Sequence, residues 1–268
     1  MPRTGGILSF PDFRGLTRKL ILWNLGAFFV LLLLGVASRG AALTIVSWTA
    51  LVPPLVLQGR VWQLLTYCFV HQGILNTAFE LLSLWFLGSF LEANHGSRWL
   101  GEIFFFSVLG AGLTAMGIYF VPSVEAGVLT GCYGGLFGLL IAFGVLYGDL
   151  EFMMFPLPMM IKAKYLVAVY LLIALAMLFS SERFFAFAQL GGALFGYLYI
   201  RMAPRGGFGF AGTERFYGLR NSYYRWKRRR AARKFEVYMR KQNRDVHFDK
   251  EGRYIDPDKD PNDRRWMN

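Results

Sequence analysis

The segment that decides the fold is TGCYGGLFGLL, at residues 130–140. It lies inside an apolar run, which is typical of the start of a membrane helix. Its glycines are three and four residues apart and therefore share one helix face: Gly131, Gly134, Gly135 and Gly138. Such a face lets another helix backbone approach closely within a bilayer, and in most proteins packing alone explains the pattern.

A second glycine face follows later in the chain. It consists of Gly191, Gly192 and Gly196, and Gln189 precedes it. Two glycine-faced helices in one chain indicate a pair that packs together. We therefore expect Gly131, Gly134 and Gly138 to serve helix packing, together with Gly192 and Gly196.

The composition indicates an integral membrane protein. Hydrophobic residues make up 55% of the chain, and the net charge is +12. Soluble domains are less apolar than this. The two cysteines lie in apolar runs and the three histidines are scattered, so the spacing favours neither a disulfide framework nor a metal site. We expect no cofactor and no metal.

The apolar runs predict an all-α protein with six membrane helices, at residues 20–37, 63–91, 100–120, 128–147, 165–179 and 184–202. A signal peptide is the alternative for the first run, but that run exceeds the ~7–15 apolar residues of a signal core. Residues 39–60 are apolar but broken by Pro53 and Pro54, which suits a segment at the membrane interface.

The charges predict the topology and the domains. Six spans place both termini on one side, and both termini and the Lys162/Lys164 loop are basic, so these parts should be cytoplasmic. The expected divisions are a cytoplasmic N-terminus (1–19), a membrane domain (20–202) and a basic cytoplasmic tail (203–268). We expect a multi-pass protein of the bacterial cytoplasmic membrane, in contact with the lipid bilayer.

Three polar residues stand out in the predicted second helix: His71, Asn76 and Glu80. Asn76 and Glu80 share a face, whereas His71 is offset from Asn76 by about 140°. A carboxylate near the middle of a membrane helix costs roughly 2.5–3.5 kcal/mol on insertion scales. Glu80 should therefore face the bundle interior, protonated or supplied with hydrogen-bond partners.

These motifs together resemble the rhomboid family of intramembrane serine proteases. The family carries its nucleophile in Gly-x-Ser-Gly on the fourth helix and its base on the sixth, just before Gly-Gly. Tyr133 stands at the serine position and Gln189 at the histidine position. Residues 39–60 are similar to the family's membrane-dipping loop, and residues 59–67 to the entry of its second helix. The resemblance covers about residues 48–201 and implies a six-helix bundle.

The resemblance extends to the family's His-x-x-x-x-His-x-x-x-Asn pattern. His71 matches its first histidine, whereas Asn76 and Glu80 replace the two residues that help hold the oxyanion in active members. All four chemically essential positions are thus altered. Tyr133 is a poor nucleophile because a phenol titrates around 10, and Gln189 cannot act as a base. Cys132, next to the nucleophile position, points ~100° away around a helix.

The resemblance therefore implies a catalytically degenerate, rhomboid-like pseudoprotease of a bacterium. Such a protein would bind transmembrane segments of client proteins, and could retain them or present them to a separate membrane protease. We expect Tyr133 to plug the cavity where substrate backbone would sit. The residues expected around the client cavity are His71, Asn76, Glu80, Tyr133 and Gln189.

Three alternatives stay open. The polar groups could form a static network that only satisfies its own members. The chain could be an active rhomboid protease with a non-standard nucleophile, although Ser83, Ser89 and Ser107 lack the motif context. A transporter using Glu80 and Gln189 is the third, but no second membrane carboxylate or internal repeat supports it.

The tail is basic and aromatic. A glycine-rich linker to Gly212 is expected to lead into residues 220–244, and residues 245–268 are expected to be flexible. A basic aromatic segment close to a membrane helix favours the anionic lipid surface. Nucleic acid and a protein partner are the less favoured alternatives. The residues expected to contact lipid are Arg225, Lys227, Arg228, Arg229 and Arg230.

Overall fold

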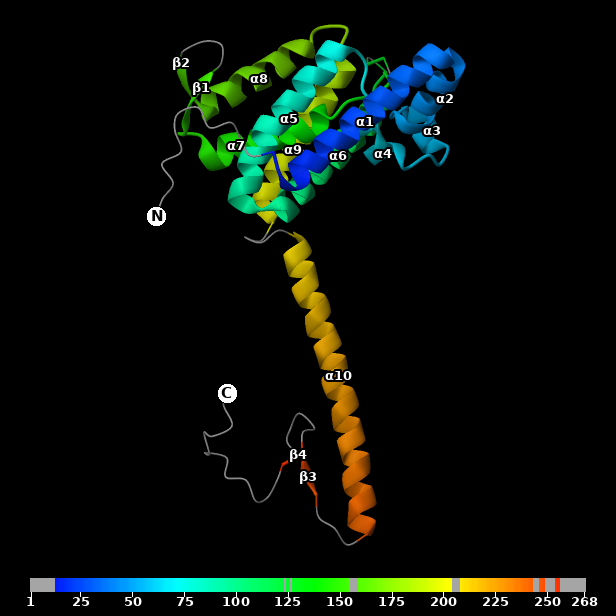
Figure 1. The fold of residues 1–268 in the computed structure, drawn as a ribbon, viewed down its shortest axis with the longest axis vertical. Coiled ribbons are helices and arrows are strands. Elements are labelled where there is room, and N and C mark those ends of the chain that lie inside the picture. Colours follow the sequence, from blue (N-terminus) through cyan, green and yellow to red (C-terminus); the bar gives the residue numbers. More distant parts are fainter. Residues whose placement is uncertain are drawn as a thin grey trace. The chain divides into compact units, whose positions relative to one another are not determined.

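The computed structural model describes residues 13–122, 124–125, 127–154, 159–203, 208–242, 246–248 and 254–255. The chain divides into two compact units, Met1–Gly207 and Phe208–Asn268. Helices dominate both units (Figure 1).

The first unit consists of helices joined by short connections and one hairpin. Its elements are α1 (Gly15–Ala37), α2 (Arg39–Thr49), α3 (Pro53–Leu57), α4 (Gln63–Thr66), the 3-10 turn η1 (Tyr67–Phe69), α5 (Ile74–His95), α6 (Ser97–Tyr119), α7 (Tyr133–Tyr147), β1 (Glu151–Met154), β2 (Met159–Lys162), α8 (Ala163–Met177) and α9 (Arg183–Met202). The two strands pair antiparallel. The second unit holds α10 (Phe208–Lys241) and the antiparallel strands β3 (His247–Phe248) and β4 (Tyr254–Ile255).

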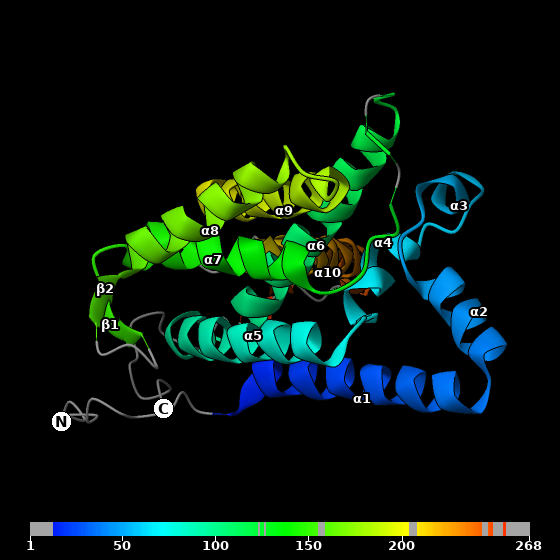
Figure 2. The ribbon, with the colours of Figure 1, turned by 90° about the horizontal axis from the view of Figure 1, so that it is seen from above.

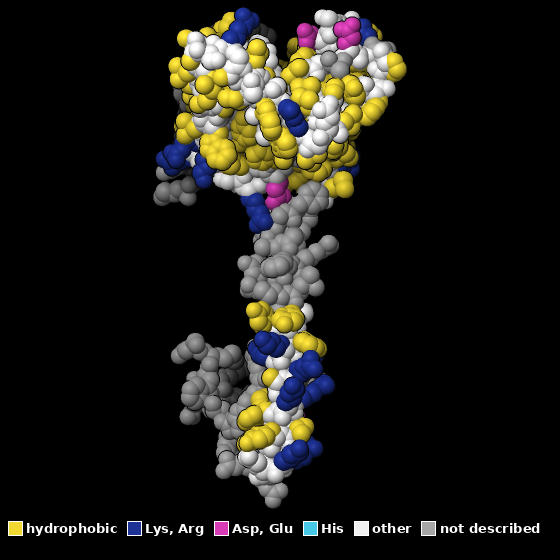
Figure 3. Space-filling view, turned by 90° about the vertical axis from the view of Figure 1, so that its right-hand side faces the viewer, with side chains coloured by type: hydrophobic (Ala, Val, Ile, Leu, Met, Phe, Trp, Pro, Cys, Tyr) yellow, Lys and Arg dark blue, Asp and Glu magenta, His cyan; other side chains and the backbone are white. Residues whose placement is uncertain are grey.

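The first unit has the surface of a membrane protein. Within the described residues, α1, α5 and α6 are long and apolar enough to cross a membrane, and α7 and α8 are shorter apolar helices. Large apolar side chains remain exposed on the outer helices, for example Leu22, Phe79 and Leu172. Figure 3 shows how densely such side chains cover this unit. Lipid satisfies an apolar surface of this kind, so the chain is an integral membrane protein.

Helices α6, α7 and α9 form the centre of the bundle. Figure 2 shows α7 between α5 on one side and α8 with α9 on the other, with α1 outside α5. The glycines allow the central contact. A Cβ on Gly192 would lie 2.2 Å from the carbonyl oxygen of Gly134, and one on Gly196 would lie 2.5 Å from Cα of Gly138. Helices α7 and α9 therefore meet backbone to backbone.

Glu92, near the end of α5, holds α1 in place. Its carboxylate accepts hydrogen bonds from the backbone N–H groups of Leu16 and Thr17, at 2.6 and 2.8 Å. The hydroxyls of Thr17 and Ser97 donate to the same carboxylate. The first N–H groups of a helix have no partner within it, so Glu92 caps α1 from a neighbouring helix.

Two sequence predictions about helix boundaries are wrong, and with them the packing role expected for Gly131. The expected second helix, 63–91, is broken: α4 and η1 precede an irregular segment, and α5 starts only at Ile74, after Gly73 turns with φ +81°. The expected fourth helix begins at Tyr133 rather than at residue 128, because Gly131 has φ +85° and cannot continue a helix backward. Gly131 therefore does not share the α7 packing face.

The tail also differs from its prediction. Helix α10 begins at Phe208, so part of the expected glycine-rich linker is helical. Most of the segment expected to be flexible, 245–268, lies outside the described residues; its described part contains β3 and β4.

The close approach of α7 and α9 gives a stability prediction. Gly192→Ala forces a methyl group into the α7 backbone and should lower the free energy of unfolding by about 1–3 kcal/mol, as overpacking does. The matched control is Gly26→Ala on α1, where a Cβ would meet no atom within 4 Å. Thermal unfolding in detergent micelles should show a lower midpoint for Gly192→Ala only. Equal midpoints for the two variants would contradict the backbone contact.

Candidate functional site

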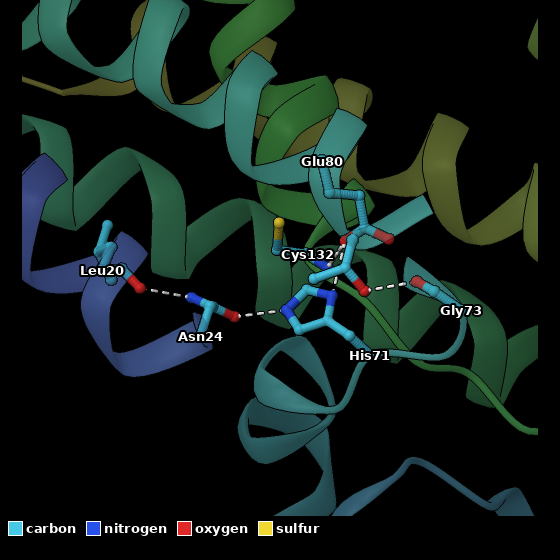
Figure 4. A network of polar contacts seen from close by, with 7 residues as sticks. Leu20, Asn24, His71, Gly73, Glu80 and Cys132 are labelled. Atoms are coloured by element: carbon cyan, nitrogen blue, oxygen red, sulfur yellow. Dashed lines mark hydrogen bonds and ion pairs between the residues drawn. The ribbon is translucent and has the colours of Figure 1, made fainter. Parts of the chain in front are cut away.

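The carboxylate of Glu80 lies at the centre of a buried polar network. Its side chain extends from the second turn of α5 into the bundle, and the residue is only 4% exposed. Glu80 Oε2 accepts a hydrogen bond of 2.7 Å from the backbone N–H of Cys132, the residue that precedes α7. Figure 4 shows the loop before α5 and the loop before α7 converging on this one carboxylate. Glu80 thus has the polar partner that a buried carboxylate in an apolar helix requires.

His71 joins Glu80 to α1. Its Nδ1 lies 3.2 Å from Glu80 Oε2, and its Nε2 lies 2.8 Å from Asn24 Oδ1 (Figure 4). Asn24 Nδ2 donates to the carbonyl oxygen of Leu20 at 2.7 Å, which turns the amide oxygen of Asn24 toward the imidazole. An amide oxygen only accepts, so Nε2 carries a proton.

The contact between Nδ1 and the carboxylate is electrostatic rather than a hydrogen bond, because Nδ1 has no hydrogen-bond partner within the described part of the chain. With Nε2 protonated, a neutral imidazole would present a lone pair to the lone pairs of Glu80. One proton held by either His71 Nδ1 or Glu80 removes that repulsion.

The backbone around the site is irregular because several loops meet there. Gly131 N–H donates to the carbonyl oxygen of Val70 at 2.7 Å, and Leu129 and Leu51 exchange hydrogen bonds of 2.9 and 3.0 Å. A Cβ at Gly131 would lie 2.7 Å from Glu80 Oε1. Glycine at this position therefore serves both the positive φ and the approach of the carboxylate.

Tyr133 and Gln189 meet at a separate small cavity. It has a volume of about 10 Å³, close to the least that one water molecule needs. Tyr67, which donates to the carbonyl oxygen of Val108 at 2.8 Å, also lines it. Glu80 and His71 are not among the lining residues. Four of the five residues expected around one cavity are therefore divided between a polar network, with His71 and Glu80, and a nearly filled cavity, with Tyr133 and Gln189.

Asn76 belongs to neither group, so its predicted place in the cavity is wrong. The residue is exposed, and so are its neighbours Ile74 and Leu75. Because α5 starts at Ile74, the first turn of the helix lies beyond the tightly packed part of the bundle. Asn76 and Glu80 share a helix face, but only Glu80 lies deep enough to be enclosed.

The two histidine side chains that the structure describes do not pair with a serine or cysteine. His71 contacts Asn24 and Glu80, and His95 contacts the Tyr147 hydroxyl at 3.0 Å. Neither is hydrogen-bonded to a serine or cysteine in the part of the chain that the structure describes. The hydroxyls of Ser89 and Ser107 are buried and without a hydrogen-bond partner there. Among the same residues, no three or more His, Cys, Asp or Glu side chains lie together in a way that could hold a metal ion.

Sequence reasoning missed Asn24, which positions His71. Its signal was a single amide inside the apolar run of the first helix, and a polar side chain in a membrane helix normally faces a partner.

The fold and the site define a helical integral membrane protein with a polar network enclosed by α1, α5 and the loop before α7. Residues 58–205 match the Rhomboid domain family, which covers more than half of the chain. The chain belongs to the rhomboid family, and the resemblance seen in its motifs is confirmed at that level.

The individual relatives share limited sequence identity with this chain. Rhomboid-like protein 19 of Arabidopsis thaliana is 27% identical over 169 residues, covering 60% of this chain and 54% of that protein. Rhomboid protease GluP of Bacillus subtilis (strain 168) is 39% identical over 98 residues, covering 35% of this chain and 18% of that protein. Rhomboid-like protease 1 of Toxoplasma gondii is 29% identical over 94 residues, covering 35% and 32% respectively. The chain thus spans about half or less of these relatives.

The network gives a second stability prediction. Glu80→Ala leaves the buried N–H of Cys132 without its acceptor and removes the carboxylate beside His71 Nδ1, and should lower the free energy of unfolding by about 1–3 kcal/mol. The control is Asn76→Ala, one turn earlier on the same helix and exposed, which should change it by less than about 0.5 kcal/mol. Thermal unfolding in micelles compares the two. A loss for Asn76→Ala as large as for Glu80→Ala would show that the network does not stabilise the fold.

Proposed function

We propose that this chain is a six-span rhomboid-family protein that has lost serine-protease chemistry and binds transmembrane segments of client proteins. The observation that carries the proposal is the hydrogen bond from Cys132 N–H to the Glu80 carboxylate. In acyl transfer, N–H donors beside the nucleophile stabilise the oxyanion. Here a donor next to Tyr133 is already bound to an acceptor of the protein itself.

Two further features support the loss of proteolysis. An ionised Glu80 would repel an oxyanion at this position, and Tyr133 and Gln189 supply neither an activated hydroxyl nor a base. The cavity beside them holds at most about one water molecule. This supports the view that the half-buried Tyr133 fills the space of a substrate backbone.

Client binding is supported by the surface that the bundle keeps. Helices α5 and α8 pack on either side of α7, and both present exposed apolar side chains such as Phe79 and Leu172. A client helix would pack there through van der Waals contact, since the hydrophobic effect does not drive association within lipid. Escort, retention, or presentation to a separate membrane protease are the roles such binding serves.

The proposal includes a location. Both termini lie in the cytoplasm, and the membrane is the cytoplasmic membrane of a bacterium. The basic residues of the loop at Lys162 and Lys164 and of the tail support this orientation.

The alternative is an active intramembrane serine endopeptidase with a non-standard nucleophile. It is favoured by two relatives whose names describe them as proteases, GluP and Rhomboid-like protease 1. The matched stretches cover 18% and 32% of those proteins, so the similarity does not assign their protease activity to this chain.

A serine-directed fluorophosphonate probe distinguishes the inactive protein from an active serine protease. We expect no labelling of the wild-type chain, and none of Tyr133→Ser/Gln189→His, because Glu80 still occupies the N–H of Cys132 and repels the phosphonate oxygen. Adding Glu80→Asn to that pair removes the charge and should give the first labelling. An active rhomboid protease serves as the positive control. Site-specific labelling of the wild type would overturn the proposal, and mapping the adduct would identify the missed nucleophile.

Client binding needs its own measurement. A photo-crosslinking residue at Phe79 on α5 or Leu172 on α8, in chains reconstituted into liposomes with a panel of transmembrane peptides, should form adducts with a subset of that panel. The control is the same residue at Trp23 on α1, which is 68% exposed. Equal adduct formation at all three positions would indicate random collision in the bilayer and contradict a client surface.

A further inference from the structure

Helix α10 is strongly cationic and carries an aromatic stripe along one side. Its sequence contains eleven Lys and Arg residues against two Glu. At 100° per residue, Tyr224, Ala231, Phe235 and Tyr238 fall within one sector of about 60°. These four form the aromatic stripe, and each is exposed, with Tyr224, Phe235 and Tyr238 at 51%, 46% and 56%.

The cations lie on the remaining surface of α10, where Tyr223, Trp226 and Val237 are also exposed. Arg225, Arg229, Arg233 and Arg240 fall on the side away from the aromatic stripe, and Lys227, Lys234 and Arg228 flank the stripe. Figure 3 shows apolar and cationic side chains gathered mostly on different sides of the described part of this helix. The combination of an aromatic stripe and flanking cations is typical of helices that lie in a membrane interface.

Part of the helix is already covered by its own unit. Ala232 is 7% exposed, and the Phe235 ring lies 6.1 Å from the Phe248 ring of β3. This contact covers the side of α10 that carries Ala232 and leaves Tyr224 and Tyr238 open. The aromatic stripe therefore lacks a complete partner among the described residues of the second unit.

We propose that α10 binds the surface of an anionic bilayer, with the aromatic stripe in the interface and the flanking cations on lipid phosphates. The chain itself brings this surface within reach: α9 ends at Met202 and α10 begins at Phe208. Five residues span at most about 17 Å. Each cation beside an anionic membrane contributes about 1 kcal/mol, or about fivefold in binding. Tyr and Trp side chains prefer the interface that the stripe would enter.

Charge favours an anionic bilayer over a second copy of α10 or a nucleic acid as the partner of this helix. A second copy of α10 packed on the stripe would bring two strongly cationic helices together, which is unfavourable. Nucleic acid would pair with the cations but leave the aromatic stripe in water unless bases stacked on it. An anionic bilayer satisfies both surfaces of the helix together.

The test measures which side of α10 faces lipid in the full-length chain. Spin labels at Ala231→Cys, in the stripe, and at Ser222→Cys lie about 180° apart around the helix. Both native positions are small and exposed, and neither change removes a charge. The native Cys68 and Cys132 are fully buried, and the unsubstituted chain gives their background. Collision rates with oxygen, which partitions into lipid, and with a water-soluble nickel chelate are measured in nanodiscs.

In nanodiscs with anionic lipid, the label at position 231 should favour oxygen and the label at 222 should favour the nickel chelate. In neutral nanodiscs, or at high salt, both should favour nickel. The triple variant Arg228→Gln/Lys227→Gln/Lys234→Gln should weaken binding of α10 to the anionic surface by roughly a hundredfold. The label at position 231 should then favour oxygen only at a much higher content of anionic lipid. Identical profiles in the two lipid compositions would overturn the proposal. Spin–spin coupling between labels at position 231 would also overturn it, because it would show that a second copy of the chain covers the stripe. Protection of the 231 label from the nickel chelate only after RNA is added would overturn it as well.

Discussion

A carboxylate inside a membrane protein must find polar partners within the protein, and Glu80 finds a backbone N–H that donates to it and an imidazole that lies beside it. The donor N–H belongs to Cys132, immediately before α7, and the imidazole belongs to the loop before α5. One side chain thus fixes two irregular loops, and Asn24 extends the network to α1. In this fold these polar groups are directed toward one another.

The arrangement depends on glycine in two different ways. In α7 and α9, missing side chains let two backbones touch, because a methyl on Gly192 would fall 2.2 Å from the oxygen of Gly134. At Gly131 the backbone adopts φ +85°, and a methyl would lie 2.7 Å from Glu80. The first use builds the bundle and the second admits the carboxylate. The same short motif therefore links the packing of the fold to the chemistry of its site.

The sequence predicted the parts of this structure that follow periodic rules. Apolar runs indicated a helical membrane protein, and the motifs around Tyr133 and Gln189 indicated the rhomboid family. The predictions failed where helix geometry was extended across irregular backbone. His71 lies on a loop, Asn76 lies in an exposed first turn, and Gly131 precedes its helix, because glycines with positive φ set the true starts of α5 and α7. Such positions depend on contacts between distant segments, which a single sequence does not display.

The partner of His71 was unpredictable for a related reason. Asn24 and His71 are 47 residues apart, and only the packing of α1 on α5 and η1 brings them together. The glycine-rich start of α10 was predicted to be a linker, but it is helical. Glycine lowers helix propensity without preventing a helix when the following residues favour one.

The central claim is that Glu80 and the residues at the nucleophile and base positions leave this rhomboid fold without proteolytic chemistry. Mass spectrometry of a generic rhomboid substrate, co-reconstituted with the purified wild-type chain in liposomes, tests it most directly. An active rhomboid protease in parallel liposomes establishes that the substrate is cleavable. The account predicts only intact substrate with the wild-type chain, at times when the active protease has consumed it. A defined cleavage product that requires the wild-type chain would contradict the account.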